Sequence, residues 1–216
     1  SLTLISTSSK SNPSSSSGRA SIVCSTGSIV TVTGLILPVT DENAMFVMLT
    51  AIEIESLKKL QSSFGKSFEK VIKTILNCKN GKIIVSGVGK SGIISQKWAA
   101  TFSSTGTSSF FMDASSASHG DLGQIDRKDL LLVFSYSGNT TELTSILKYA
   151  NRFNIKIIGV ASKPDSTLIK ASDVKILIPI VKEADPTGMV PTSSTSITLL
   201  LGDCLAVALM NKIKFS

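Results

Sequence analysis

Histidine and cysteine are scarce in this 216-residue chain, which has one histidine, His119, and three cysteines, Cys24, Cys78 and Cys204. The cysteines lie far apart and form no Cys-x-x-Cys pair, so the sequence excludes a disulfide framework and a cysteine-rich zinc site. A single histidine also excludes a histidine-clustered metal centre. No run approaches 18 consecutive apolar residues, so we expect no membrane-spanning helix.

Charged residues are also few, at 17% of the chain, whereas hydrophobic residues make up 42%. This composition supports a sizeable core and excludes wholesale disorder, and the length favours one domain with at most a short extension. The net charge of +7 favours an anionic ligand. Because the lysines are dispersed and form no stripe, we expect a small anion and no nucleic acid.

Residues 1–43 differ from the rest, because they are rich in serine and poor in acidic residues. Such a segment has little to bury, so we expect a disordered or non-native leader and assign it no secondary structure. Three explanations stay open. A transit peptide would be serine-rich but would carry more arginine than the single Arg19; the others are a disordered tail and an artefact upstream of a natural start at Met45 or Met48. Residues 44–216 are then the functional domain.

An apolar repeat at helical spacing starts near Ala51 and predicts one long amphipathic helix that ends near Cys78, with Asn80 and Gly81 as its stop. Beyond it, short apolar runs alternate with helical stretches. The predicted strands are KIIVSG, SSFFM, DLLLVFS, KIIGVA and DVKILIPI, and the predicted helices span residues 91–104, 140–153 and 194–212. This alternation predicts an α/β protein, a three-layer αβα sandwich with a five-stranded parallel sheet.

A glycine-rich loop, GVGKSG at residues 87–92, follows the first predicted strand. Its spacing fits the dinucleotide fingerprint GxGxxG, and Asp113 lies about twenty positions further on, where that fingerprint needs an acidic residue. A lysine inside the turn is atypical of the fingerprint, and the turn suits any phosphate. A P-loop is excluded, because its first glycine would have to be residue 84, which is Ile84. The alternative to a phosphate contact is a tight strand-to-helix turn.

A second loop, SYSGNTTE at residues 135–142, follows the third predicted strand and opens a helix. Four serine and threonine hydroxyls lie there beside the free amides of a helix N-terminus, an arrangement that binds a phosphate monoester without lysine or arginine. N-capping alone explains one or two of these hydroxyls but not four. Ligands of open parallel sheets bind beyond the carboxyl ends of the strands, so we expect both loops at one site.

Six motifs resemble, in order, those of the SIS (sugar isomerase) domain family, and most closely its arabinose-5-phosphate isomerases. They are GVGKSG, FSSTGTSSFF, ASHGDLG, SYSGNTTE, KEADPTGMVPTSSTS and GDCLAVAL. The resemblance implies a SIS phosphosugar-binding domain over residues 44–216 with a flavodoxin-like sheet. It also implies an isomerase that interconverts D-arabinose 5-phosphate and D-ribulose 5-phosphate through an enediol, with no metal or organic cofactor, and that supplies a lipopolysaccharide precursor.

By the same resemblance, phosphate binding is assigned to four hydroxyls and to the backbone amides around Gly138. The four hydroxyl residues are Ser91, Ser135, Ser137 and Thr140.

The resemblance assigns catalysis to Lys90, Glu142, Glu183 and His119. We expect Lys90 to polarise the carbonyl or stabilise the enediolate. We favour Glu183 as the base, although the sequence does not rank it against Glu142. His119 is expected to shuttle protons or contact substrate, also across a subunit interface. Each has an alternative without a catalytic role. Lys90 is then a surface lysine, Glu142 complements a helix dipole, Glu183 is solvated, and His119 is structural.

The chain departs from the family pattern at Asn139 and Asp185, where close relatives usually have glutamate and cysteine. These changes are expected to retune the site without abolishing phosphate binding. The sequence also stops at Ser216, before the family's histidine-containing HPGG-type segment and pair of CBS domains. If that histidine contributes to turnover, we expect substrate binding with impaired activity.

Members of the family associate, so we expect a homotetramer or a dimer, formed through the helix before Cys78 and the final helix. We also expect a cytoplasmic location and neither a nucleic-acid nor a membrane partner. Two other functions stay open: another phosphosugar isomerase, such as a hexulose-phosphate isomerase, and a non-catalytic SIS sugar-phosphate sensor. The ASHGD and KEADP motifs favour the pentose, and no helix-turn-helix pattern accompanies the domain.

Overall fold

The computed structural model describes residues 19–23, 29–33 and 41–215, with side chains from residue 45 onward. The chain divides into two units, Ser1–Glu55 and Ser56–Ser216. In the first unit, strand β1 (Arg19–Val23) pairs antiparallel with β2 (Ile29–Thr33). The sequence analysis assigns no secondary structure here, and the β-branched run of β2 accounts for the difference, since such residues favour strands. Disorder of the remaining leader lies outside the described residues.

Two helices, α1 (Asp41–Ser63) and α2 (Lys66–Leu76), replace the single long helix that the apolar periodicity predicted, so that prediction is wrong. The chain leaves the helical conformation at Phe64 and Gly65, and Gly65 is extended, with φ −172° and ψ −151°. Glycine interrupts a helix because it loses the most backbone entropy on folding. The predicted stop is close to the observed one, since α2 ends one residue before its cap at Asn77.

Five parallel strands form the sheet of the second unit. They are β3 (Ile83–Gly87), β4 (Ser109–Asp113), β5 (Leu130–Phe134), β6 (Lys156–Ala161) and β7 (Val174–Leu177). Their spatial order is β4-β3-β5-β6-β7. Counted from the first strand of this sheet, the order is 2-1-3-4-5, which is the flavodoxin-like doubly wound arrangement. The predicted five-stranded parallel sheet is therefore confirmed.

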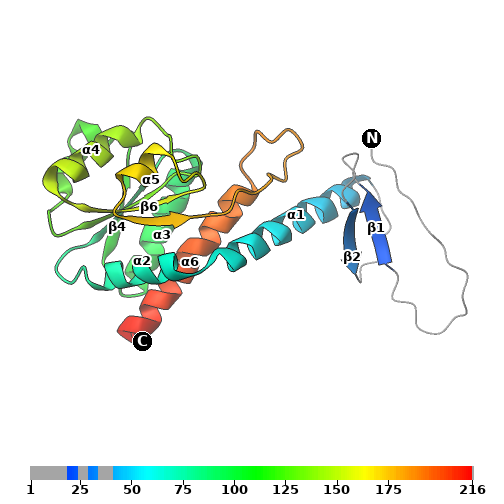
Figure 1. Cartoon of the computed structure of the whole chain (residues 1–216), viewed down its shortest axis with the longest axis horizontal. Helices are drawn as coiled ribbons and strands as arrows, with labels where there is room; N and C mark the ends of the chain where they lie inside the picture. The colour runs from blue at the N-terminus through cyan, green and yellow to red at the C-terminus, as the bar shows by residue number, and fades with distance from the viewer. Residues whose placement is uncertain (1–18, 24–28, 34–40, 216) are drawn as a thin grey trace, which may run out of the picture. The chain divides into compact units, whose positions relative to one another are not determined.

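Helices cover both faces of this sheet, as expected of a three-layer α/β sandwich (Figure 1). One face carries α2, α3 and α6, and the other carries α4 and α5. The bounds are α3 (Lys90–Ser104), α4 (Leu143–Phe153), α5 (Thr167–Ala171) and α6 (Ser193–Ile213), with short 3-10 turns η1 (Ala117–His119) and η2 (Asp121–Gln124) after β4. The sequence analysis missed α5, because five residues are too few to show a helical period.

Alternate residues of each central strand enter opposite layers of the core. Ile83 and Val85 of β3 pack in the layer of α3 and α6, whereas Ile84 packs in the layer of α4. Every residue of β3 and of β5 is buried. Burial on both faces explains why these strands appear in the sequence as unbroken apolar runs.

Helices α3 and α6 approach each other closely at Gly202. The indole of Trp98, on α3, is fully buried, and its Nε1 donates a hydrogen bond to the carbonyl oxygen of Thr198 at 3.1 Å. A Cβ atom at residue 202 would overlap that indole ring. The missing side chain therefore sets the spacing of the two helices whose first turns reach the site described below.

Helix α6 is long and apolar enough to cross a membrane, judged by length and composition. Half of its most apolar window is nevertheless buried, and Ile197, Leu201 and Leu205 pack in the layer of the core that it shares with α3. This burial is typical of the core helix of an α/β domain.

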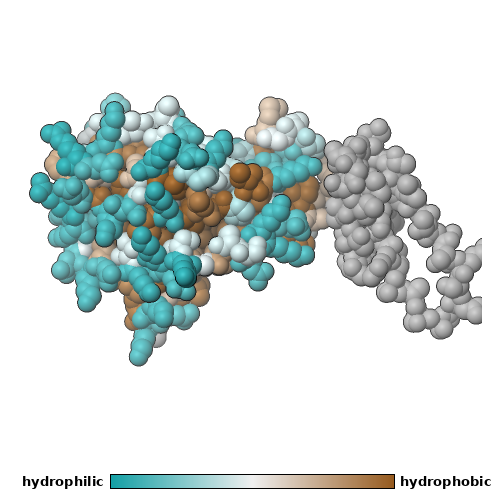
Figure 2. Space-filling view, viewed as in Figure 1, coloured by the Kyte–Doolittle hydropathy of each residue, from teal (hydrophilic) through white to brown (hydrophobic). Residues whose placement is uncertain are grey.

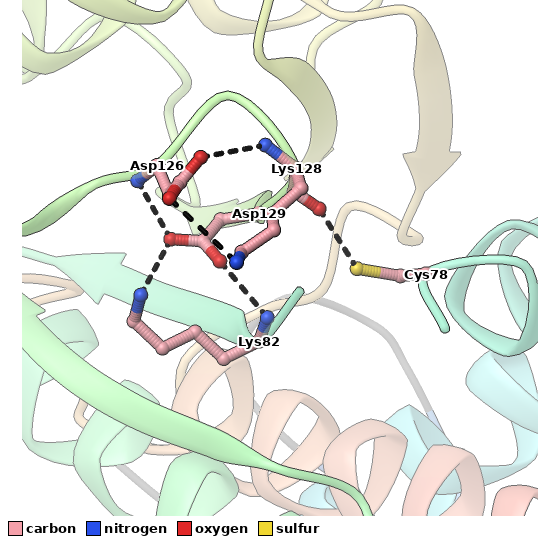
Figure 3. A network of polar contacts seen from close by, with 5 residues as sticks. All are labelled: Cys78, Lys82, Asp126, Lys128 and Asp129. Carbon is pink, nitrogen blue, oxygen red and sulfur yellow. Dashed lines mark hydrogen bonds and ion pairs between the residues drawn. The ribbon is translucent and has the colours of Figure 1, made fainter. Parts of the chain in front are cut away.

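A polar network joins the amino-terminal ends of β3 and β5, on the edge of the sheet opposite the site (Figure 3). The buried carboxylate of Asp129 accepts hydrogen bonds from Lys82 Nζ at 2.7 Å, from the Lys82 amide at 3.0 Å and from the Asp126 amide at 2.8 Å. Burial by itself raises the pKa of Asp129, but these bonds outweigh it and lower the pKa. Cys78 Sγ donates to the Lys128 carbonyl oxygen at 3.4 Å. The network anchors the entry of two strands.

Candidate active site

The strand order reverses between β3 and β5, and the two predicted phosphate loops follow these strands. Because β3 and β5 are adjacent and parallel, their carboxyl ends lie at the same edge of the sheet. From there the chain turns into α3 on one face and α4 on the other. Loops that diverge in this way leave a crevice, which is the usual ligand site of doubly wound sheets.

A cavity of about 340 Å³ lies at this edge. Three of the predicted site residues, Lys90, Ser91 and Glu183, line it, although Glu183 lies far from the other two in the sequence. Its full lining is Val88, Lys90, Ser91, Phe134, Tyr136, Glu183, Pro191, Ser194 and Thr195. The cavity therefore combines a cation, a carboxylate and several hydroxyls.

Glu183 lies in the connection between β7 and α6, and its carboxylate is held at the first turn of α6. Oε2 accepts hydrogen bonds from the Thr192 amide at 2.7 Å, from Thr192 Oγ1 at 3.1 Å and from the Ser194 amide at 3.2 Å. Partial burial raises the pKa of Glu183, but hydrogen bonds from Ser194 and Thr192 outweigh it and lower the pKa. The carboxylate is therefore ionised at neutral pH and is held by these bonds at one wall of the cavity.

Lys90 and Ser91 are the first two residues of α3. The Lys90 side chain is exposed and lines the cavity mouth, and Ser91 is half-buried. The unpaired amides of the first helical turn add partial positive charge to that of the lysine. This corner of the cavity therefore favours an anion.

The loop after β5 is closed by its own hydroxyls. Ser135 Oγ lies 2.8 Å from Thr140 Oγ1 and accepts the Gly138 amide at 3.1 Å, and Ser137 Oγ accepts the amide of Asn139 at 3.3 Å. Ser135 is buried, with 3% of its surface exposed. Of the loop residues assigned to phosphate, namely Ser135, Ser137, Gly138 and Thr140, none lines the cavity. In this structure, the hydroxyls of the loop bind one another and the loop's own amides.

Gly138 gives this loop its shape. Its φ is +69°, in the left-handed region that favours glycine, and a Cβ there would overlap Ser166. The neighbouring Asn139 Oδ1 accepts the Thr167 amide at 2.9 Å and the Thr167 hydroxyl at 3.1 Å, which ties the loop to the start of α5. The asparagine that departs from the family pattern thus has a structural role.

Two of the predicted catalytic residues, Glu142 and His119, lie outside the cavity lining, and both are exposed. Glu142 directly precedes α4 and accepts a hydrogen bond from Thr141 Oγ1 at 3.0 Å. His119 ends the turn η1, in the segment that follows β4. The structure therefore separates the two glutamates, and only Glu183 shares a cavity with Lys90.

Sequence reasoning did not single out Tyr136, although it lies inside the SYSGNT motif. Its ring lines the cavity together with Lys90 and Glu183. Burial raises the pKa of the Tyr136 hydroxyl, an effect to which the charge of Glu183 adds and which the hydrogen bond from the Val181 amide opposes. The phenol is therefore protonated at neutral pH.

Asp185, the second departure from the family pattern, organises the turn after Glu183. Its carboxylate accepts hydrogen bonds from the Thr187 hydroxyl and from the amides of Met189 and Val190, the last two at 2.9 and 3.0 Å. The bonds from Thr187 and Val190 are the main causes that lower the pKa of Asp185 to about 2. An anion here shapes the loop that brings Pro191 to the cavity wall.

Other candidate ligand groups have local partners or lie apart. Asp113, which fits the dinucleotide spacing, accepts the Ser115 amide at 2.8 Å and does not line the cavity. Cys78 and Cys204 are free thiols whose pKa is raised by burial, whereas Cys24 lies outside the described residues. Within residues 19–23, 29–33 and 41–215, no three histidine, cysteine or acidic side chains gather as metal ligands.

Comparison with known sequences gives a family match over most of the second unit. The sequence profile of the SIS domain matches residues 75–208. The arabinose 5-phosphate isomerase KdsD of Shigella flexneri is 43% identical over 160 residues, which cover 74% of this chain and 48% of that protein. The protein of the same name from Francisella tularensis is 44% identical over 167 residues, 76% of this chain and 51% of that one. The chain spans about half the length of these relatives.

Among solved structures, the E. coli CFT073 protein c3406, in complex with arabinose 5-phosphate, superposes with a TM-score of 0.79. It is 35% identical, and the match covers 83% of this chain and 95% of that one. The similarity therefore extends over nearly all of that solved chain and over most of the fold described above.

Proposed function

The chain belongs to the SIS domain family, and from this premise we propose that it is an aldose–ketose isomerase acting on D-arabinose 5-phosphate and D-ribulose 5-phosphate. Relatives that carry the name arabinose 5-phosphate isomerase, at 43% and 44% identity, support the choice of substrate. Because the chain spans about half of their length, the activity is a proposal for this chain.

The observation that carries the proposal is that Glu183 and Lys90 line the same cavity. An isomerase of this kind needs a base at the C1–C2 bond and a positive group near the two oxygens. The ionised carboxylate of Glu183 supplies the base, and Lys90 with the first turn of α3 supplies the positive group. We therefore assign the base to Glu183 and not to the exposed Glu142.

In the proposed reaction, Glu183 removes the proton on C2 of open-chain arabinose 5-phosphate. The electron pair of the C–H bond forms the enediolate, whose negative charge Lys90 stabilises. The protonated Glu183 then delivers a proton to C1, and the hydroxyl proton moves from O2 to O1, which gives ribulose 5-phosphate with no net loss or gain of atoms. We propose that Ser91 and the loop of Ser135, Ser137, Gly138 and Thr140 bind the phosphate, which fixes the reacting carbons.

Proton NMR of D-ribulose 5-phosphate incubated with the protein in deuterated water tests this function directly. We expect an arabinose anomeric signal to appear with deuterium at C2, because the proton that the base takes from C1 exchanges with solvent deuterium before the enediol is reprotonated at C2. Binding of the phosphosugar without any exchange would contradict the isomerase and favour a sugar-phosphate sensor. Exchange only with a hexulose phosphate would retain the chemistry and overturn the choice of pentose.

We also propose that the chain forms a homodimer or homotetramer through an apolar groove between α2 and α6. The groove has a volume of about 570 Å³, and its lining is Phe64, Phe68, Leu200, Asp203, Cys204, Val207, Ala208 and Asn211. Along α6 these residues follow helical spacing, and Val207 is 51% exposed. Hydrophobic surface is visible among the hydrophilic residues of this unit in Figure 2.

Light scattering at micromolar concentration is expected to give the mass of a dimer or tetramer, and Val207→Lys to shift it toward the monomer, because a charge would enter an apolar contact. A monomeric mass for the unaltered chain would refute this proposal.

His119, which is exposed, is proposed to reach the cavity of a neighbouring subunit in such an assembly.

We further propose a cytoplasmic reaction that supplies a lipopolysaccharide precursor, as the resemblance implies. Restored lipopolysaccharide in a bacterium that lacks its own arabinose-5-phosphate isomerase would support this placement, and failure by a chain that is active in vitro would contradict it.

A further inference from the structure

One residue, Tyr136, joins three connections that leave the carboxyl edge of the sheet. It belongs to the loop after β5, and its carbonyl oxygen accepts two hydrogen bonds from Ser162, which directly follows β6: one from the amide at 2.9 Å and one from the hydroxyl at 2.7 Å. Its phenol oxygen accepts the amide of Val181, beyond β7, at 2.9 Å. Main chain and side chain of the same residue therefore tie the ends of three neighbouring strands together.

The contact with Val181 matters because the segment that follows carries the proposed base. Val181 is buried and precedes Glu183 by two residues. Between Ile178 and Thr192 the chain has no helix or strand, and several of its amides bind side-chain oxygens instead of a backbone ladder. On the far side of Glu183, the amide of Ala184 is bound by Thr192 Oγ1 at 2.8 Å. Tyr136 is thus the anchor on one side of the base and Thr192 the anchor on the other.

The phenol is suited to this anchoring. Its oxygen uses a lone pair for the Val181 amide, so the O–H group keeps its proton for a partner in the cavity that Tyr136 lines with Glu183. Because burial, with the nearby charge of Glu183, raises the pKa of this hydroxyl, it stays protonated across the neutral range.

We propose that Tyr136 is a positioning residue: by fixing the backbone at Val181 it holds the Glu183 carboxylate in register with the phosphate loop from which Tyr136 itself projects. Its role as a positioning residue for catalysis rests on the proposed isomerase function. Loss of the hydroxyl should misplace the base while leaving the phosphate contacts in place. A misplacement of about 1 Å is enough to slow a reaction about 10²-fold.

The test compares Tyr136→Phe with Tyr149→Phe. These are the only two tyrosines of the chain, and Tyr149 packs against Phe153 on α4, away from the cavity. For Tyr136→Phe we expect kcat to fall about 10- to 100-fold with KM changed less than about threefold, since the lost interaction acts on the reacting carbons and not on substrate binding. For Tyr149→Phe we expect both constants to stay at their unaltered values.

Hydrogen exchange at the Val181 amide gives a readout that does not need turnover. In Tyr136→Phe we expect this amide to exchange at least about tenfold faster, while the amides of β5 and β6 keep their rates. Unchanged kcat in the variant, or a rise in KM at constant kcat, would overturn the positioning role. If the unaltered protein turns over no pentose phosphate, the isomerase proposal fails by itself. Unchanged exchange at Val181 would then overturn the anchor, and faster exchange would retain it.

Discussion

Replacing Glu183 with glutamine is expected to slow deuterium exchange at C2 of the phosphosugar by about 10³-fold, with affinity for the phosphosugar held within about threefold. Glutamine has the same shape, and its amide oxygen can still accept the hydrogen bonds from Thr192 and Ser194. It cannot take a proton, so only the chemical step is lost. The measurements are NMR exchange for the chemistry and calorimetry for the affinity.

Glu142→Gln is the matched control, because this carboxylate is exposed and lies outside the cavity lining. We expect less than about a tenfold loss of exchange. If Glu142→Gln abolished exchange and Glu183→Gln did not, the base assignment would be reversed. A chain that binds the sugar phosphate equally well in all three forms, and exchanges in none, would be a sensor.

When the proposed phosphate loop is altered, we expect the opposite result, a loss of affinity for the phosphosugar. Ser137→Ala combined with Thr140→Ala should weaken affinity at least about 100-fold, since two hydrogen bonds to a charged group contribute roughly 1.5–3 kcal/mol each and 1.4 kcal/mol is about tenfold. Thr141→Ala is the control in the same loop, because the Thr141 hydroxyl is engaged with Glu142. Unchanged affinity in the double variant would refute the assignment of this loop to phosphate.

The second large effect concerns stability and falls at the opposite edge of the sheet, in the network of Figure 3. Asp129→Ala is expected to lower the free energy of unfolding by about 3 kcal/mol, because it leaves the amides of Lys82 and Asp126 without their acceptor. Denaturant unfolding measures this change. Asp126→Ala is the matched control: the Asp126 side chain is 56% exposed, pairs with Lys128 Nζ at 3.8 Å and accepts the Lys128 amide at 3.3 Å. Because water can replace the lost acceptor at this exposed site, we expect a change within about 1 kcal/mol.

The contribution of Asp129 to stability is expected to depend on pH. The folded pKa of Asp129 lies below its ordinary value of 3.8, so its contribution to stability is present above that value and is lost as the pH falls through the folded pKa. The unaltered protein should therefore lose stability more steeply below about pH 4 than Asp129→Ala. Parallel acid limbs for the two proteins would contradict the structural role of the network.

The sheet was predictable because its strands are buried on both faces. Runs such as KIIGVA contain little but apolar residues, and the observed β6 has the predicted bounds. The break between α1 and α2 was not predictable from periodicity, because apolar residues keep helical spacing across Gly65. Only the extended backbone at that glycine shows that one predicted helix is two.

The site was predictable where a residue type is tied to a motif. Lys90, Ser91 and Glu183, which the resemblance assigns to the site, line the same cavity, while their roles remain predictions. Tyr136 was missed because its importance comes from an amide 45 positions further along the chain. The closure of the loop after β5 by Ser135 and Thr140 was also missed, since a sequence shows hydroxyls but not which of them bind each other.

The irregular connection from Ile178 to Thr192, which carries the proposed base, differs in local stability from the sheet. Strands β3 to β7 are joined by continuous ladders of backbone hydrogen bonds. This connection has no ladder: two side chains, Ile178 and Val181, pack in the core, and the rest is held by scattered hydrogen bonds, mainly to Tyr136, Thr192 and Asp185. Segments held in this way open at a lower free energy than the whole domain. We therefore expect the carboxylate of Glu183 to lose its position at a lower temperature than the sheet unfolds, so that an intact fold does not guarantee an assembled site.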